Sequence, residues 1–420
     1  MISTNRVGAR PSCRGQAAQT PLLAAGLLLV AMFLPGCSLG RPLLFNVSVA
    51  PTTISPNADG HDDIAVIRYK LGGPALVSIW LEDRAGQKRF WRDHERRSAG
   101  NDYESWFWGG VDNRVLPDGT YTLVVQAEPL SGGQASAVTS TLTITNGDSQ
   151  VPAIENLMVA PPVFTPNRDG VGDHVKISYS LVKAAERLTI KLVGPDGREW
   201  AIPEDQIRDA TAAGYHIHDF DGGVDLGAEP PPDGDYTVVV EATDQVGNKD
   251  RQTAALRIDQ GGIPRAQIVR NDASFSTTVL RVGDTLTFTA TVQNSGDVPI
   301  RTHGPEPGTT YTSDQNYNAF DEPIESGAFR IGLDYEGSYT ANGFSYPFRW
   351  QLGRDDELTV IDGHKYLMPG QTVTITGTLT LVKAPPREAP AFWVGLIHED
   401  VENVADRVGW TYITVDRIAR

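Results

Sequence analysis

Two short stretches of the chain carry closely spaced side-chain oxygens that could hold a cation. Residues 55–63 read SPNADGHDD and residues 165–173 read TPNRDGVGD, so both fit the frame [ST]-Pro-Asn-x-Asp-Gly-x-x-Asp. Hard oxygen ligands in a short loop are typical of calcium sites. The candidate ligands are one asparagine and two aspartates in each copy, namely Asn57, Asp59 and Asp63, and Asn167, Asp169 and Asp173.

The same residues have a second use that requires no metal. Asn and Asp side chains accept hydrogen bonds from backbone N–H groups two residues further along the chain. Proline starts such a turn, and glycine permits the positive φ that folds the chain back on itself. The sequence therefore leaves two alternatives for both loops, a Ca²⁺ site that rigidifies its surroundings or a structural turn.

Three common catalytic motifs do not occur in the sequence. It has no His-Glu-x-x-His, no Gly-x-Ser-x-Gly and no phosphate-binding glycine loop. His216 and His218 would lie on one face of a strand, where two imidazoles could bind a transition metal, but we expect them to be solvent-exposed. A glycosidase carboxylate pair has no sequence marker here. We therefore predict that the protein is not an enzyme.

The first 36 residues predict an export signal. Three arginines and no acidic residue precede an apolar segment from Leu22 to Leu34, which is short for a membrane span but typical of a signal-peptide core. The following Pro35-Gly36-Cys37 completes a resemblance to a bacterial lipobox, although Pro35 is less usual there. We expect a signal peptide over 1–36, a lipid on Cys37 and a chain tethered to the outer side of a bacterial membrane. The alternatives are a plain signal peptide and an anchor helix.

Charge and cysteine content limit the partners. The 420 residues carry a net charge of −16, which opposes binding to nucleic acid. The two cysteines, Cys13 and Cys37, both precede the predicted folded part, so the sequence supplies no disulfide framework and no thiolate metal site there. We expect contact with the membrane through the lipid, and with an envelope protein or glycan.

Much of the chain is a tandem duplication. A shift of 110 residues places Val49-Ala50-Pro51 on Val159-Ala160-Pro161, and after small insertions PDGTY at 117–121 meets PDGDY at 232–236. A repeat of this length is a common domain size. Apolar residues alternate with polar ones between Asp-Gly turn signals, which predicts β-sandwiches.

Both repeats contain the Asn/Asp loop and the closing Pro-Asp-Gly-x-Tyr strand, and the first also contains a Trp-x-Gly-x-Asp segment at 108–112. Together these features resemble the FlgD-type Ig-like domain of flagellar-hook capping proteins and bacterial surface proteins. The resemblance implies two Ig-like domains, at 37–147 and 148–262, which act as spacers or assembly surfaces. Asp221 replaces Trp108 in the second copy, with Phe220 beside it, so we expect its core aromatic residue to be shifted.

Residues 263–420 are not a third copy. The segment GDTLTFTATVQNSG at 283–296 resembles adhesion-type Ig-like domains of bacterial surface proteins, which implies a C-terminal Ig-like β-sandwich. Residues 303–350 are rich in aromatic side chains, which form a contact surface for sugars or proteins, or else close the core. The candidate ligand-binding residues in this segment are Tyr311, Tyr317, Tyr339 and Trp350.

The sequence thus predicts an all-β chain of three Ig-like β-sandwich domains in tandem after a lipoprotein signal peptide. The predicted function is that of a non-catalytic cell-surface lipoprotein, a structural, adhesive or assembly module that binds another envelope component. The alternative is a carbohydrate-binding accessory protein that uses the aromatic segment 303–350.

Overall fold

The computed structural model describes residues 41–203, 209–339 and 343–416, and the predicted signal peptide and Cys37 lie outside these ranges. The fold is all-β, as predicted, with Ig-like β-sandwiches in tandem. Among the described residues, no helix is both long enough and apolar enough to cross a membrane.

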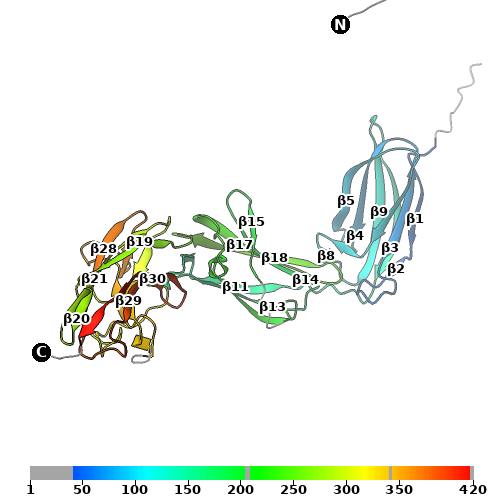
Figure 1. The fold of residues 1–420 in the computed structure, drawn as a ribbon. Helices are drawn as coiled ribbons and strands as arrows, with labels where there is room; N and C mark the ends of the chain where they lie inside the picture. The colour runs from blue at the N-terminus through cyan, green and yellow to red at the C-terminus, as the bar shows by residue number, and fades with distance from the viewer. Residues whose placement is uncertain (1–40, 204–208, 340–342, 417–420) are drawn as a thin grey trace, which may run out of the picture. The chain divides into compact units, whose positions relative to one another are not determined.

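The first module is a sandwich of two sheets, with strand orders β1-β3-β6 and β2-β10-β9-β4-β5 (Figure 1). β2 pairs in parallel with β10 in the second of these, and β7 and β8 form a small ribbon. Alternate residues such as Val77, Ile79 and Leu81 point into the core and are buried, as their spacing predicts. The strands are β1 (Leu44–Ala50), β2 (Thr53–Ile54), β3 (Ala65–Leu71), β4 (Ala75–Glu82), β5 (Lys88–Arg97), β6 (Asp102–Phe107), β7 (Gly110–Val111), β8 (Arg114–Val115), β9 (Gly119–Pro129) and β10 (Ser136–Ile144).

The second module repeats this topology, with strand orders β11-β13-β16 and β12-β18-β17-β14-β15. The short parallel pair also recurs, because β12 pairs with β18 as β2 pairs with β10. The duplication seen in the sequence is therefore a duplication of strand order. The strands are β11 (Ile154–Ala160), β12 (Val163–Phe164), β13 (Val175–Leu181), β14 (Arg187–Val193), β15 (Glu199–Ala201), β16 (Gly214–Phe220), β17 (Gly234–Thr243) and β18 (Lys249–Ile258).

The closing Pro-Asp-Gly-x-Tyr motif has a structural explanation in both modules. The hydroxyl of Tyr121 donates to the carbonyl of Pro117 at 2.7 Å, and Tyr236 makes the same bond at 2.5 Å. The Asp118 carboxylate accepts N–H bonds from residues 146 and 147, where the chain leaves the module. Asp233 does the same for residues 260 and 261. The motif thus fixes the exit of each module.

The predicted shift of the core aromatic residue in the second module is wrong. Phe107 and Phe220 occupy equivalent positions at the ends of β6 and β16, and both are buried in their cores. Trp108 is only half-buried and lies outside that core. A Cβ built on Gly247 would be 3.2 Å from its ring, so Trp108 packs against a turn of the second module.

The C-terminal module contains two larger sheets and a parallel pair, β20 with β31. One sheet has the order β19-β21-β28-β23, and the other the order β26-β27-β22-β24-β29-β30 with β25 also pairing with β24. Leu286, Phe288, Ala290 and Val292 are buried on β21, as the alternation predicts. The strands are β19 (Ala266–Phe275), β20 (Val279–Arg281), β21 (Thr285–Asn294), β22 (Ile300–Thr302), β23 (Thr310–Thr312), β24 (Phe329–Tyr335), β25 (Phe348–Gln351), β26 (Thr359–Ile361), β27 (His364–Leu367), β28 (Thr372–Thr380), β29 (Ala391–His398), β30 (Glu402–Tyr412) and β31 (Thr414–Asp416).

Candidate functional site

The first Asn/Asp loop is organised by its own side chains. Oδ1 of Asp63 accepts the N–H groups of Asn57 and Ala58 at 3.0 Å each, and Oδ2 accepts that of Gly60 at 2.9 Å. Oδ1 of Asn57 accepts the N–H of Asp59, and Oδ1 of Asp59 accepts that of His61. These bonds describe the Asx-type turn that was the alternative to a metal site.

The second loop repeats the pattern but is buried. Asp173 accepts the N–H of Asn167 at 3.1 Å and that of Gly170 at 2.6 Å, and Asp169 accepts that of Val171 at 2.8 Å. Asn167, Asp169 and Asp173 are only 1%, 3% and 8% exposed. Most of the first loop, by contrast, is open to solvent.

The oxygens of the second loop fit a turn better than a calcium cage. The side-chain oxygens of Asn167, Asp169 and Asp173 all accept hydrogen bonds, four of them from backbone N–H groups of the loop itself. Among the residues that the structure describes, no group of three or more His, Cys, Asp or Glu side chains is arranged to hold a metal ion. Calcium binding by these loops remains a prediction of the sequence, and a thermal measurement given below tests it.

The second loop is docked onto the C-terminal module by three side chains from different strands. The Nε of Arg301, on β22, donates to the carbonyl of Asp169 at 2.5 Å. The hydroxyl of Tyr366, on β27, donates to Oδ2 of Asp169 at 2.9 Å. Nε2 of His398, at the end of β29, lies 2.8 Å from the carbonyl of Arg168 and must carry the proton to donate to it.

Glycines let the two backbones meet at this contact. A Cβ built on Gly170 would lie 2.0 Å from the carbonyl oxygen of Ser326, and one built on Gly327 would lie 2.2 Å from the carbonyl carbon of Asp169. Both glycines also have φ values near +80°. The glycine of the repeated frame therefore has two roles in the second copy, to form the turn and to permit the contact.

Burial governs the ionisation of the docked groups. It lowers the pKa of His398 to about 4, so the imidazole is neutral at pH 7. It also raises the pKa values of Asp169 and Asp173, although the N–H bonds to their oxygens oppose that rise. Burial raises the pKa of Tyr366, and the charge of Asp169 adds to the effect.

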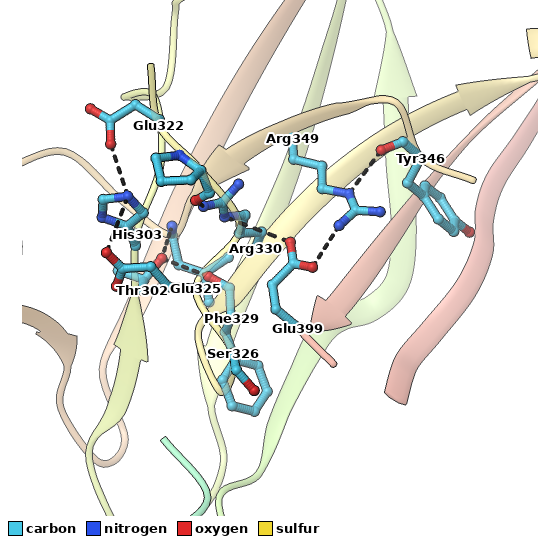
Figure 2. Close-up of polar contacts among 12 residues, drawn as sticks. Thr302, His303, Glu322, Glu325, Ser326, Phe329, Arg330, Tyr346, Arg349 and Glu399 are labelled. Carbon is cyan, nitrogen blue, oxygen red and sulfur yellow. Dashed lines mark hydrogen bonds and ion pairs between the residues drawn. The ribbon is translucent and has the colours of Figure 1, made fainter. Parts of the chain in front are cut away.

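An ionic network lies beside the docked loop inside the C-terminal module (Figure 2). Arg330 is fully buried, and its Nε is 3.6 Å from Oε1 of Glu399. The other oxygen of Glu399 accepts a hydrogen bond from Arg349 at 2.5 Å, and Arg349 also donates to the carbonyl of Tyr346 at 2.9 Å. The result is one buried carboxylate held between two guanidinium groups.

A second group of charged residues includes Arg301, which also contacts the docked loop. Arg301 donates to Glu325. His303 lies 2.9 Å from Glu322 and 3.6 Å from Glu325 (Figure 2). Burial lowers the pKa of His303, and the charge of Glu325 opposes this. Each glutamate of the network thus has a cationic or imidazole neighbour.

A hollow of about 650 Å³ opens beside the docked loop and contains charges of both signs. Arg168, His174 and Asp225 line this hollow. Arg168 and His174 lie 3.5 and 3.6 Å from the carboxylate of Asp225. Asp173 and Asp400 also line the hollow. Asp225 therefore faces basic neighbours instead of forming an acid pair.

The junction between the first two modules is also hydrogen-bonded. The fully buried Asn248 accepts the N–H of Val115 at 2.6 Å and donates to the carbonyl of Asp148 at 2.8 Å. The N–H of Lys249 donates to the carbonyl of Asn113 at 2.9 Å. A buried side chain thus fixes this junction too.

The predicted aromatic platform does not form at the surface. Tyr311 and Trp350 are fully buried and Tyr317 is 5% exposed, so these rings close the core, which was the alternative interpretation. Tyr311 and Trp350 also donate their polar hydrogens to the carbonyls of Arg349 and Thr309. Tyr339, at 64%, is the exposed member of the four. The prediction of a platform made of these four residues is wrong.

The two strand histidines are buried, which also corrects the sequence prediction. His216 and His218 lie on one face of β16, as expected, and stack on Tyr179 with ring centroids 5.2 and 5.7 Å away. His216 is bonded to the carbonyl of Ala212, and His218 lies 3.2 Å from the Tyr179 hydroxyl. Their nitrogens take part in core hydrogen bonds and are not directed at a common metal position.

Sequence reasoning missed the docking side chains and the arginine network. A signal was present, because Arg330 and Arg349 each lie between two apolar residues on strands that are otherwise buried. A charged residue in such a position must have a buried partner. Glu399, in the turn that follows β29, is that partner for both arginines.

Comparison with known proteins adds little beyond the fold. No family model matches the chain, and no curated protein matches it. A Ca²⁺-stabilized adhesin that helps an Antarctic bacterium bind ice is 13% identical, covering 90% of this chain and 74% of its own, with a TM-score of 0.27. Fibronectin(III)-like modules of Clostridium thermocellum CbhA are 12% identical, covering 50% of this chain and 92% of their own, with a TM-score of 0.20. TM-scores this low do not indicate a shared function.

Proposed function

We propose that this chain is an exported, non-catalytic lipoprotein that displays or spaces a binding surface at the cell envelope and binds another envelope component. The observation that carries the proposal is the pair of fixed junctions. Asn248 is fully buried at one of them, and Arg301, 3% exposed, contacts the Asp169 loop at the other. Hydrogen bonds buried at a junction limit the motion between neighbouring modules. Such junctions suit a chain that holds a binding surface at a set distance from its anchor.

The finer features of the proposal come from the sequence. The lipid would be attached to Cys37, and the domains would extend over 37–147, 148–262 and 263–420, with the first two of FlgD type. The carbohydrate-binding alternative loses its support in the segment 303–350, because three of its four candidate rings are buried.

Labelling with a radioactive fatty acid tests the anchor. The full chain should incorporate the label, Cys37→Ala should abolish incorporation, and Cys13→Ala should leave it unchanged as a matched control. Pull-down from intact envelope with the tethered chain should then enrich an envelope protein or glycan. An unlabelled chain, or a labelled one that captures nothing above the level of a control lipoprotein, would contradict the proposal.

A further inference from the structure

One strand of the first module departs from the acidic character of the chain. β5 contains five cationic residues and two acidic ones over ten positions, a local charge of +3 (5 − 2). The whole chain carries −16, so the rest of it carries −19 (−16 − 3). The cationic residues of β5 are Lys88, Arg89, Arg92, Arg96 and Arg97.

β5 is also an edge strand with an exposed surface. It ends the sheet order β2-β10-β9-β4-β5 and pairs with β4 alone in that sheet (Figure 1). Lys88, Arg92 and Arg96 are exposed, and Phe90 between them is 43% exposed. A sheet edge of ten residues is about 30 Å long and presents unpaired backbone groups as well as side chains.

Within the described residues, three of the five cations have no carboxylate partner. Arg92 and Arg97 both pair with Glu95, and the nearby Asp93 lies against His94. Lys88 instead lies over the ring of Trp80 at 4.8 Å, and Arg89 is bonded to the amide of Gln87. In the part of the chain that the structure describes, no carboxylate lies within 4.0 Å of the charged group of Lys88, Arg89 or Arg96. Glu82 is opposite Lys88 in the pairing of β4 with β5, but the two side chains do not form an ion pair.

We infer that the β5 edge binds a linear, carboxylated polysaccharide. An arginine without a carboxylate partner can bind a carboxylate through two parallel hydrogen bonds. Phe90 and Lys88 both contact Trp80, and Phe90 offers apolar area there on which a sugar face can pack. The three cations without a carboxylate partner, Lys88, Arg89 and Arg96, lie along about 26 Å of this edge. A polymer with carboxylates at several points along its length can contact all three at once.

Nucleic acid fits this edge less well. Duplex DNA carries a charge about every 1.7 Å, far more densely than β5 can match, and the −19 of the remaining chain repels it. A purely protective role is the other explanation, since charged side chains on edge strands prevent strand pairing between molecules. The measurement below separates these interpretations.

The test measures binding of the full chain to polygalacturonate, with dextran as a neutral polymer and a single-stranded oligonucleotide as a phosphate polymer. We expect binding to polygalacturonate alone, and a loss of that binding as salt rises from about 0.15 M to about 1 M, where the screening length falls from about 8 to about 3 Å. The variant Lys88→Gln/Arg89→Gln/Arg96→Gln should bind about tenfold more weakly or worse.

A control with the same change in net charge removes three exposed cations elsewhere, Arg251→Gln/Arg257→Gln/Arg281→Gln, whose side chains are 57%, 49% and 52% exposed and each lie near a carboxylate. This control should bind within about twofold of the parent. No binding to polygalacturonate, equal weakening in both triple variants, or tighter binding to the oligonucleotide would overturn the inference. The inference rests on the proposed surface location, but failure here leaves the lipid labelling and envelope pull-down unaffected, so the two can fail separately.

Discussion

The hydroxyl of Tyr366 donates a hydrogen bond of 2.9 Å to Oδ2 of Asp169, although 197 residues separate the two in the chain. Asp169 belongs to the repeated Asn/Asp loop, and its other oxygen accepts a backbone bond within that loop. One carboxylate thus closes the turn of the second module and holds the C-terminal module. The residue that the sequence suggests as a calcium ligand acts as a connector between modules.

Replacing Tyr366 by phenylalanine should loosen this connection without disturbing either fold. The change leaves the buried carboxylate of Asp169 with one fewer donor, which costs about 1.5–3 kcal/mol for a hydrogen bond to a charged group. Hydrogen exchange of the amides at 167–173 reports the free energy of local opening. Tyr339→Phe, at an exposed ring, is the control and should change nothing. Equal exchange in both variants would show that the bond contributes no stability.

The buried His398 predicts that the junction weakens in mild acid. Its pKa is about 4 in the folded chain and 6.5 in the reference state, so the unfolded chain binds the extra proton first. Stability should therefore fall as the pH drops from about 6.5 to about 4, by about 3 kcal/mol in all. Asp169 and Asp173 act in the opposite direction, because their raised pKa values stabilise the folded state at low pH.

Comparison with His398→Gln isolates the imidazole from the two carboxylates. Glutamine can still donate to the carbonyl of Arg168 but does not titrate in this range. The difference in unfolding free energy between parent and variant should change with pH between 4 and 6.5. A constant difference across this window would contradict a neutral, buried His398.

The buried charge of Glu399 should be essential to the C-terminal module. Glu399→Gln removes the carboxylate that faces both Arg330 and Arg349, and leaves the fully buried Arg330 and the partly buried Arg349 without this counter-charge. The expected loss is about 3–5 kcal/mol, measured by denaturant unfolding followed by tryptophan fluorescence. Glu402→Gln, at an exposed position on β30, should cost less than about 0.5 kcal/mol. Equal midpoints for both variants would count against a structural role for the network.

Calcium provides a direct test of the two interpretations of the loops. Because their oxygens already accept backbone N–H bonds, we expect millimolar Ca²⁺ to leave the melting temperature unchanged. A rise that disappears in the double variant Asp59→Ala/Asp169→Ala would instead show that the loops bind the ion, in agreement with the first interpretation of the sequence.

The alternation of apolar and polar residues along the sequence was enough to predict the all-β sandwiches. It did not predict side-chain burial and contacts that depend on residues far apart in the chain. Alternation on β21 and the repeated Pro-Asp-Gly-x-Tyr motif depend on neighbours in the chain, and the structure agrees with both. The burial of Tyr311 or His218 depends on which sheet face a strand turns inward and what covers it, which composition does not encode. The bond between Tyr366 and Asp169 requires the relative placement of two modules, about which a single sequence carries no signal.

The glycines of the repeated frame offer the most direct test that the second loop is a docking element and the first is a free turn. Gly60 and Gly170 have nearly the same φ, +85° and +81°, but a Cβ on Gly60 meets nothing within 4 Å, whereas one on Gly170 lies 2.0 Å from Ser326. Gly60→Ala should therefore cost about 1–2 kcal/mol of backbone strain in its own loop. Gly170→Ala should cost about 3 kcal/mol or more, and should also raise hydrogen exchange around Ser326. Equal costs in the two loops, with Ser326 unaffected, would contradict the docking of the second loop.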